Sequence, residues 1–553
     1  MTTKLLANVF ATGLFVFLAG CQPKNETNLL ANTLLYCSEG SPDLFNPQLV
    51  TSGTTIDAVS NQLYNRLVKI NPQTGMVESD LARTVIISED KMRYRFYLRA
   101  GVEFHTTDYF TPTRTLNSED VAFSFARVFH SNHPYNKVGG GFYPFFDGVE
   151  FAQLVEQIIV VDDLTIEFRL TDPQASFLAN MATDFAIILS AEYAEQLSEQ
   201  GLEENIDHYP IGTGPYKYEH YVTDRYIRYK KHENYWASQP NFEQVIFDIT
   251  PNNSNRVAKL LTKECDILGY PGASDVQYLE NKNGIDIVEA SSMNVSYWAF
   301  NTSEPPFDNP MVRKALSYIV DRDAIIDAVY RNHAEPASSL LPPNNWAYKK
   351  IDRNLDFSIE KAKAMLTEAG YPDGFDMDIW AMPVQRVYNP NAGKMAEILQ
   401  QNLSLIGVNA NIVTYDWGTF RKKLAQGEHD SVLIGWLADN SDPDNFFRPL
   451  LSCAAAFSGS NRSAWCNDEF DSKILQALSI TEPEQRKAFY QEAENILFEQ
   501  VPLVPIAHAV RYRVNRDNIS GVELNPYGGI SFENAKKHAK KTDKTTRAKE
   551  GKK

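Results

Sequence analysis

Asn440, Asp442 and Asp444 place an amide and two carboxylates at alternate positions, a spacing that could hold a cation. Asn440, Asp442 and Asp444 match the first, third and fifth positions of a calcium-binding loop. Asn445, however, replaces the glycine that the turn of such a loop requires, and Leu451 replaces its bidentate glutamate. The segment therefore does not predict a calcium site.

The short motifs that carry most enzymatic chemistry are also missing. The sequence has no G-x-S-x-G, no H-E-x-x-H and no P-loop, and Pro215 breaks the glycine pattern that begins at Gly212. His130 and His133 are expected in a surface loop before Pro134, not around a metal. We therefore predict that the chain is not an enzyme and has no cofactor and no metal.

Composition and charge narrow the class further. The 553 residues are 43% hydrophobic and 22% charged, which excludes a polytopic membrane protein and a mostly disordered chain. A net charge of −17 argues against a nucleic-acid partner for the body of the protein. Residues 536–553 are rich in lysine and predict a basic, disordered tail, with contact to an anionic surface as the alternative.

The N-terminus has the features of an export signal. Lys4 precedes the apolar residues 5–18, and small residues lead directly into Cys21. The pattern resembles a bacterial lipobox and predicts a signal peptide over residues 1–20 with lipid attached to Cys21. A conventional signal peptide is the alternative. Four cysteines would then remain in an oxidising compartment, as disulfides or as buried free thiols.

Strand and helix patterns alternate along the rest of the chain. Residues 93–99 alternate apolar and polar side chains, as a half-buried strand does. Asn309 and Pro310 form a helix start, with apolar residues following at helical spacing. Residues 375–380, 392–406 and 408–413 predict a strand, a helix and a strand. The expected architecture is mixed α/β with several lobes.

Several motifs, taken together and in order, resemble one protein family. They include Tyr36-Cys37-Ser38-Glu39-Gly40, residues 116–121, residues 212–216, residues 312–316 and Gly435-Trp436. The chain resembles the extracytoplasmic solute-binding proteins of peptide ABC importers, bacterial family 5, over about residues 34–532. Residues 382–391 resemble the dipeptide-binding (DppA) type, whereas residues 142–151 and 448–453 are more similar to the SapA type.

The resemblance implies a two-lobed, three-domain periplasmic-binding-protein-like fold with a hinge (class II, cluster C). It implies a discontinuous domain I (30–62, 210–290 and 510–535), a domain II (63–209) and a domain III (291–509). It also implies two disulfides, Cys37 with Cys265 and Cys453 with Cys466.

A site for short peptides must hold an ammonium group at one end and a carboxylate at the other. By resemblance, Asp439 would pair with the α-amine, and Arg386 would bind the carboxylate beside Tyr388. The alternatives are a turn aspartate that bonds its own backbone and a surface arginine. Additional ligand contacts are expected from Trp436 and from three residues of domain I: Thr51, Ser52 and Gly53.

The function implied is the substrate-binding component of a peptide ABC importer. We expect a periplasmic monomer of a Gram-negative bacterium, tethered by lipid, that delivers di- or oligopeptides to an inner-membrane permease with ATPase subunits. The alternatives are the same fold with another cargo, namely an antimicrobial peptide, a murein peptide, haem or nickel. A secreted hydrolase is the alternative outside the family.

Overall fold

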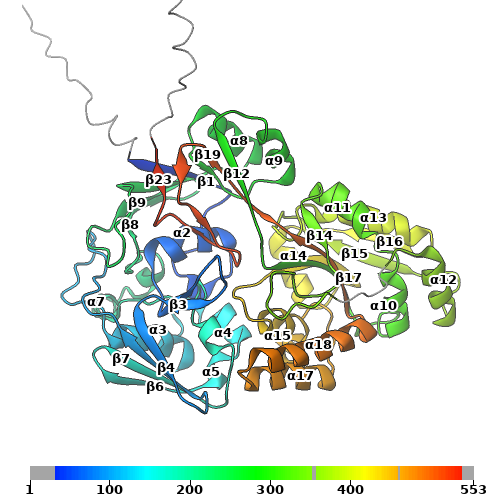
Figure 1. Cartoon of the computed structure of the whole chain (residues 1–553), viewed down its shortest axis with the longest axis horizontal. Helices are drawn as coiled ribbons and strands as arrows, with labels where there is room; N and C mark the ends of the chain where they lie inside the picture. Colours follow the sequence, from blue (N-terminus) through cyan, green and yellow to red (C-terminus); the bar gives the residue numbers. More distant parts are fainter. Residues whose placement is uncertain (1–31, 351–355, 459–460, 539–553) are drawn as a thin grey trace, which may run out of the picture.

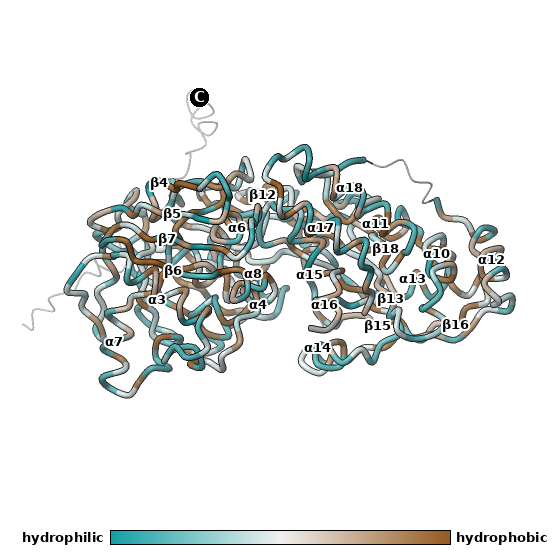
Figure 2. The backbone as a smooth tube through the Cα atoms, turned by 90° about the horizontal axis from the view of Figure 1, so that it is seen from below, coloured by the Kyte–Doolittle hydropathy of each residue, from teal (hydrophilic) through white to brown (hydrophobic). Residues whose placement is uncertain are grey.

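A computed structural model describes residues 32–350, 356–458 and 461–538. Figures 1 and 2 show two lobes in views at right angles. The predicted mixed α/β, two-lobed fold is confirmed. The predicted signal peptide, Cys21 and the tail beyond residue 538 lie outside the described residues.

The first lobe contains two sheets. The strands of its seven-stranded sheet are, in spatial order, β12 (Ile285–Ala290), β19 (Arg511–Arg516), β11 (Ile267–Leu268), β1 (Thr33–Ser38), β10 (Gln244–Ile249), β9 (Tyr226–Lys231) and β8 (Tyr216–Val222). Its four-stranded sheet has the order β4 (Ala82–Ile87), β5 (Arg93–Leu98), β7 (Thr165–Leu170) and β6 (Val155–Asp162). Tyr94, Phe96 and Leu98 of β5 are buried, as the alternation predicts.

Helices and short hairpins complete the first lobe. The helices are α2 (Gly53–Leu63), α3 (Ser118–Phe129), α4 (Pro144–Gly148), α5 (Phe151–Leu154), α6 (Phe177–Asn180), α7 (Ala191–Gln200), α8 (Asn253–Thr262) and α9 (Ala273–Leu279), with 3₁₀ turns at Pro47–Leu49, Val138–Gly140 and Glu203–Asp207. The paired short strands are β2 (Val68–Ile70) with β3 (Val77–Ser79), β20 (Ile519–Ser520) with β23 (Lys536–Lys537), and β21 (Glu523–Leu524) with β22 (Ile530–Ser531).

The second lobe is built on a six-stranded sheet, β14 (Ala334–Pro336), β18 (Leu503–Ala509), β13 (Asn294–Phe300), β17 (Ser431–Leu437), β15 (Asp376–Ala381) and β16 (Asn409–Val413). All seven residues of β13 are buried, because β18 and β17 flank it. The helices of this lobe are α10 (Pro310–Ser317), α11 (Arg322–Tyr330), α12 (Ile359–Glu368), α13 (Ala392–Ser404), α14 (Trp417–Ala425), α15 (Asp444–Leu451), α16 (Cys453–Ser458), α17 (Asp468–Ser479) and α18 (Pro483–Gln500). The predicted strand, helix and strand of residues 375–413 are confirmed as β15, α13 and β16.

The chain passes between the two large sheets at two places that lie side by side (Figure 1). β12 ends at Ala290 before β13 begins, and β18 ends at Ala509 before β19 begins. The buried Asn294 side chain joins the two passages, since its Nδ2 donates to the Ala509 carbonyl (2.6 Å) and its Oδ1 accepts from the Ala509 amide (3.0 Å). Both connections are short, as a hinge between lobes requires.

Both disulfides implied by the resemblance are present. Cys37 is bonded to Cys265 in the first lobe, and Cys453 to Cys466 in the second. In the part of the chain that the structure describes, no helix combines the length and the apolar character needed to cross a bilayer.

The predicted start of the disordered tail is wrong by a few residues. Lys536 and Lys537 form β23, paired with β20. The Lys537 ammonium lies 3.1 Å from the buried Asp266 carboxylate, which also binds Arg516. A buried carboxylate needs cationic partners, and Lys537 is one of them, although the lysine-rich sequence around it is typical of a disordered tail.

Candidate functional site

Asp439 lies two residues after the end of β17, in the turn that leads to α15. It is partly buried, and its backbone amide donates to Asn445 Oδ1 (2.9 Å). Asn445 Nδ2 donates to the Asp439 carboxylate (3.3 Å). Burial raises the pKa of Asp439 to about 7, and the negative charge of Asp184 adds to this rise. A carboxylate in this environment is stabilised by an incoming cation.

Asn445 also fixes Trp436, the predicted aromatic residue of the site. Its Oδ1 accepts the indole Nε1–H of Trp436 at 3.1 Å, in addition to the Asp439 amide. One buried side-chain amide therefore orients both the acid and the neighbouring ring. The sequence marks Asn445 only as the residue in place of a calcium-loop glycine, and this role is not predicted from it.

Arg386 and Tyr388 lie in the connection between β15 and α13. Arg386 and Asn389 exchange two backbone hydrogen bonds of 3.1 Å, which close a tight turn around Tyr388. The Arg386 side chain is exposed, and its guanidinium carbon lies 5.3 Å from the centre of the Trp417 ring. The planar group is thus held over an aromatic face while its nitrogens stay accessible.

Tyr388 is packed against the strand that carries Trp436. Its ring covers Gly435, where an added Cβ would lie 2.4 Å from Tyr388 Cδ2. Its backbone carbonyl accepts from the Tyr330 hydroxyl at 2.7 Å. Burial raises the pKa of Tyr388, and the Arg386 guanidinium beside its hydroxyl acts in the opposite direction. The glycine therefore allows the Arg386 turn to approach β17 closely.

Thr51, Ser52 and Gly53 lie in the other lobe, at the start of α2. Thr51 and Gly53 are exposed and Ser52 is partly buried. The Tyr270 hydroxyl closes on Gly53, at 2.8 Å from the position a Cβ would take. Burial raises the pKa of Tyr270, while Arg386 of the second lobe opposes this rise. Tyr270 therefore packs beside the Thr51–Gly53 segment of the first lobe.

Further acidic groups lie on the first-lobe side. Asp184 accepts from Arg66 Nη1 at 2.6 Å and influences the pKa of Asp439. The pKa of Glu39 is raised by burial and lowered by Arg386, and its Oε1 accepts from Thr54 Oγ1 at 3.0 Å. Asp184 and Glu39 are not among the predicted site residues, although Glu39 lies within the motif at residues 36–40.

The acidic pair of the rejected calcium loop has arginine partners. Asp442 receives two hydrogen bonds from Arg486, of 2.8 and 2.9 Å, and Asp444 receives two from Arg448, of 2.7 and 3.0 Å. These ion pairs are buried and hold the turn after Asp439 to the helices of the second lobe. Asp439 thus projects from a turn that is fixed on its C-terminal side.

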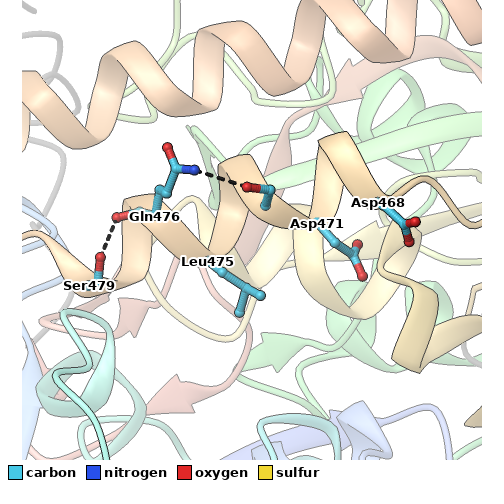
Figure 3. Close-up of a pocket in the computed structure, with 6 residues that line it drawn as sticks. Asp468, Asp471, Leu475, Gln476 and Ser479 are labelled. Carbon is cyan, nitrogen blue, oxygen red and sulfur yellow. Dashed lines mark hydrogen bonds between the residues drawn. The ribbon is translucent and has the colours of Figure 1, made fainter.

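A surface depression of about 480 Å³ lies elsewhere, along α17 (Figure 3). One helix supplies all of its lining residues: Asp468, Asp471, Ser472, Leu475, Gln476 and Ser479. None of the predicted site residues belongs to it, and two lobes are not needed to form it. Asp439, Arg386 and the residues in contact with them remain the candidate site.

Comparisons with known proteins show the family to which the chain belongs. Residues 76–458 match the family described as bacterial extracellular solute-binding proteins, family 5 Middle. A dipeptide-binding protein of Escherichia coli is 45% identical, with 91% of this chain and 94% of that protein covered. A heme-binding protein A of Haemophilus influenzae is 39% identical, with 96% and 98% covered.

A solved structure gives the same result for the fold. The dipeptide-binding protein from Pseudoalteromonas sp. SM9913, crystallised in complex with Met-Leu, superposes with a TM-score of 0.86. It is 48% identical, and the match covers 91% of this chain and all of that one.

Proposed function

Because the chain belongs to family 5 of the bacterial extracellular solute-binding proteins, we propose that it captures short peptides and delivers them to an ABC importer. The observation that carries this proposal is Asp439, a carboxylate held by Asn445 at the end of β17, with its pKa raised to about 7 by burial. The names of two relatives, which bind dipeptides, support the cargo class.

In the proposed complex, the peptide lies between the lobes and both of its charged ends are bound by the second lobe. The ammonium group pairs with Asp439, and the carboxylate binds the accessible nitrogens of Arg386 beside Tyr388. An extended residue spans about 3.3–3.6 Å, so the separation of these two groups limits the peptide length. Thr51, Ser52 and Gly53 close over the peptide from the first lobe, and Trp436 contacts a side chain.

The proposal extends to location and organisation. We infer a periplasmic protein with a lipid tether at Cys21, which acts as a monomer and docks on a permease with ATPase subunits. We also infer the division into domain I, domain II and domain III, and the three large sheets support it: the seven-stranded sheet for I, the four-stranded sheet for II and the six-stranded sheet for III.

A thermal-shift panel tests the function. The mature chain is heated with dipeptides, tripeptides, pentapeptides, a cationic antimicrobial peptide, haem or a nickel salt. A ligand that binds only the native state raises the melting temperature. We expect unblocked dipeptides to raise it, and dipeptides blocked at both ends to leave it unchanged. A shift with haem alone would contradict the peptide assignment and leave the family intact.

A further inference from the structure

The turn that carries Asp439 also bridges the two lobes. Asn440 is fully buried, and its Nδ2 donates to Asn180 Oδ1 of α6 in the first lobe, at 2.9 Å. Ser441 Oγ donates to the carbonyl of Gly75, in the β2–β3 hairpin, at 2.8 Å. These two residues directly follow the acid of the site, so ligand contact and lobe contact share one turn.

The turn is stiffened so that the two contacts are linked. Asn440 Oδ1 accepts from the amide of Asp442 at 2.9 Å, and Asp442 in turn forms the buried pair with Arg486. Ser441 has its carbonyl bound by Asn345 Nδ2 at 3.3 Å. A turn held at both ends cannot move Asp439 without also moving Asn440 and Ser441.

We propose that Asn440 and Ser441, with Asn180 and Gly75, form an interlobe latch that holds the lobes closed over a ligand bound to Asp439. This inference rests on the proposed function. The latch touches neither end of the peptide, so it contributes to affinity without contributing to the choice of ligand. Its formation is the step that converts a peptide bound on the second lobe into one enclosed by both lobes.

Other contacts also join the two lobes. The Ala175 amide donates to the Leu478 carbonyl at 2.8 Å, and Arg448 lies 3.8 Å from Glu150. The Arg448 pair involves a half-exposed glutamate, and exposed ion pairs add little. The Asn440–Asn180 bond differs because both side chains are buried, so losing one partner leaves a buried polar group unpaired.

Asn180→Ala is the decisive variant for two reasons. Among the described residues, the Asn180 side chain hydrogen-bonds only to Asn440, and Asn180 lies outside the turn that carries Asp439. Ser441→Ala is added to remove the second bond. Asn255→Ala, at an exposed position of α8, is the matched control. Affinity and dissociation rate are measured by calorimetry and surface plasmon resonance with several unblocked dipeptides, and lobe distances by spin labels on the two lobes.

We expect the double variant to bind every dipeptide about tenfold more weakly, through faster dissociation, and the Asn255→Ala control to bind like the wild type. An affinity within twofold of the wild type would overturn the latch. If the wild type binds no peptide, the proposed function fails. The latch is then tested separately, by comparing the spin-label distances between the lobes in the unliganded wild type and variant. A smaller closed population in the unliganded variant supports it, and identical distance distributions overturn it.

Discussion

At the scale of single residues, Asp439 controls how binding depends on pH. Burial raises its pKa to about 7, and a bound ammonium group favours the ionised form. Binding must therefore expel a proton at acidic pH. We expect the affinity for an unblocked dipeptide to be about thirtyfold weaker at pH 5.5 than at its maximum near pH 7.5.

Calorimetry in buffers with different ionisation enthalpies measures that proton release directly. Asp439→Asn is the control, since an amide does not titrate, and its weaker binding should be flat between pH 5.5 and 7.5. Equal affinities of the wild type at the two pH values would contradict the role of Asp439.

Asp57 predicts a pH dependence of stability. It is 3% exposed in α2, its carboxylate accepts from the Tyr36 hydroxyl, and burial raises its pKa to about 7. Because the folded-state pKa lies above the unfolded value, its stabilising contribution is complete below about pH 4 and is lost as the pH rises through 7. Asp57→Asn should therefore gain stability relative to the wild type, by up to about 4 kcal/mol at pH 8.

Urea denaturation at pH 5 and pH 8 tests this prediction for Asp57. The difference in the free energy of unfolding between variant and wild type should grow with pH. A difference that stays constant would show that Asp57 has an ordinary pKa.

At the scale of elements, the approach of the Arg386 turn to β17 depends on Gly435. A Cβ there would lie 2.4 Å from Tyr388 and 2.4 Å from the Val295 carbonyl, so backbone must move. We expect Gly435→Ala to cost about 1–3 kcal/mol of stability and to weaken dipeptide binding, because Tyr388 and Arg386 are displaced together. Denaturation and calorimetry measure the two effects.

Gly393→Ala provides the matched control for Gly435→Ala. A Cβ added at Gly393, which lies in α13, would approach only Asn391 Oδ1, at 3.7 Å. Alanine favours a helix by about 1 kcal/mol over glycine, so this variant should keep both stability and affinity. If Gly435→Ala keeps the same stability and affinity as Gly393→Ala, the packing role of Gly435 is refuted.

The elements were more predictable from the sequence than the site. The period-2 pattern of β5 and the Asn309–Pro310 start of α10 are local signals, and both appear in the structure. The roles given to Asp439 and Arg386 came from resemblance and stay predictions. Asn445, Asp184 and Tyr270 were missed because their contacts join residues that folding alone brings together, and no short spacing encodes them.

At the scale of the whole molecule, two short passages connect the lobes, and Asn294 joins them. Its side chain is fully buried and bonds both the amide and the carbonyl of Ala509. Asn294→Ala leaves these two groups unpaired, so we expect a loss of about 1–3 kcal/mol in the free energy of unfolding. Denaturant titration measures it, and a loss below about 0.5 kcal/mol would show that the passages do not depend on this residue.

The central claim is that the two lobes capture a short peptide by its free ends, with Asp439 and Arg386 as the two anchors. Titration calorimetry of an unblocked dipeptide into the wild type, Asp439→Ala and Arg386→Ala tests it most directly. Each variant leaves one ligand charge buried without its partner, so we expect the Kd to rise more than tenfold in both. Unchanged affinity in both variants would contradict the account.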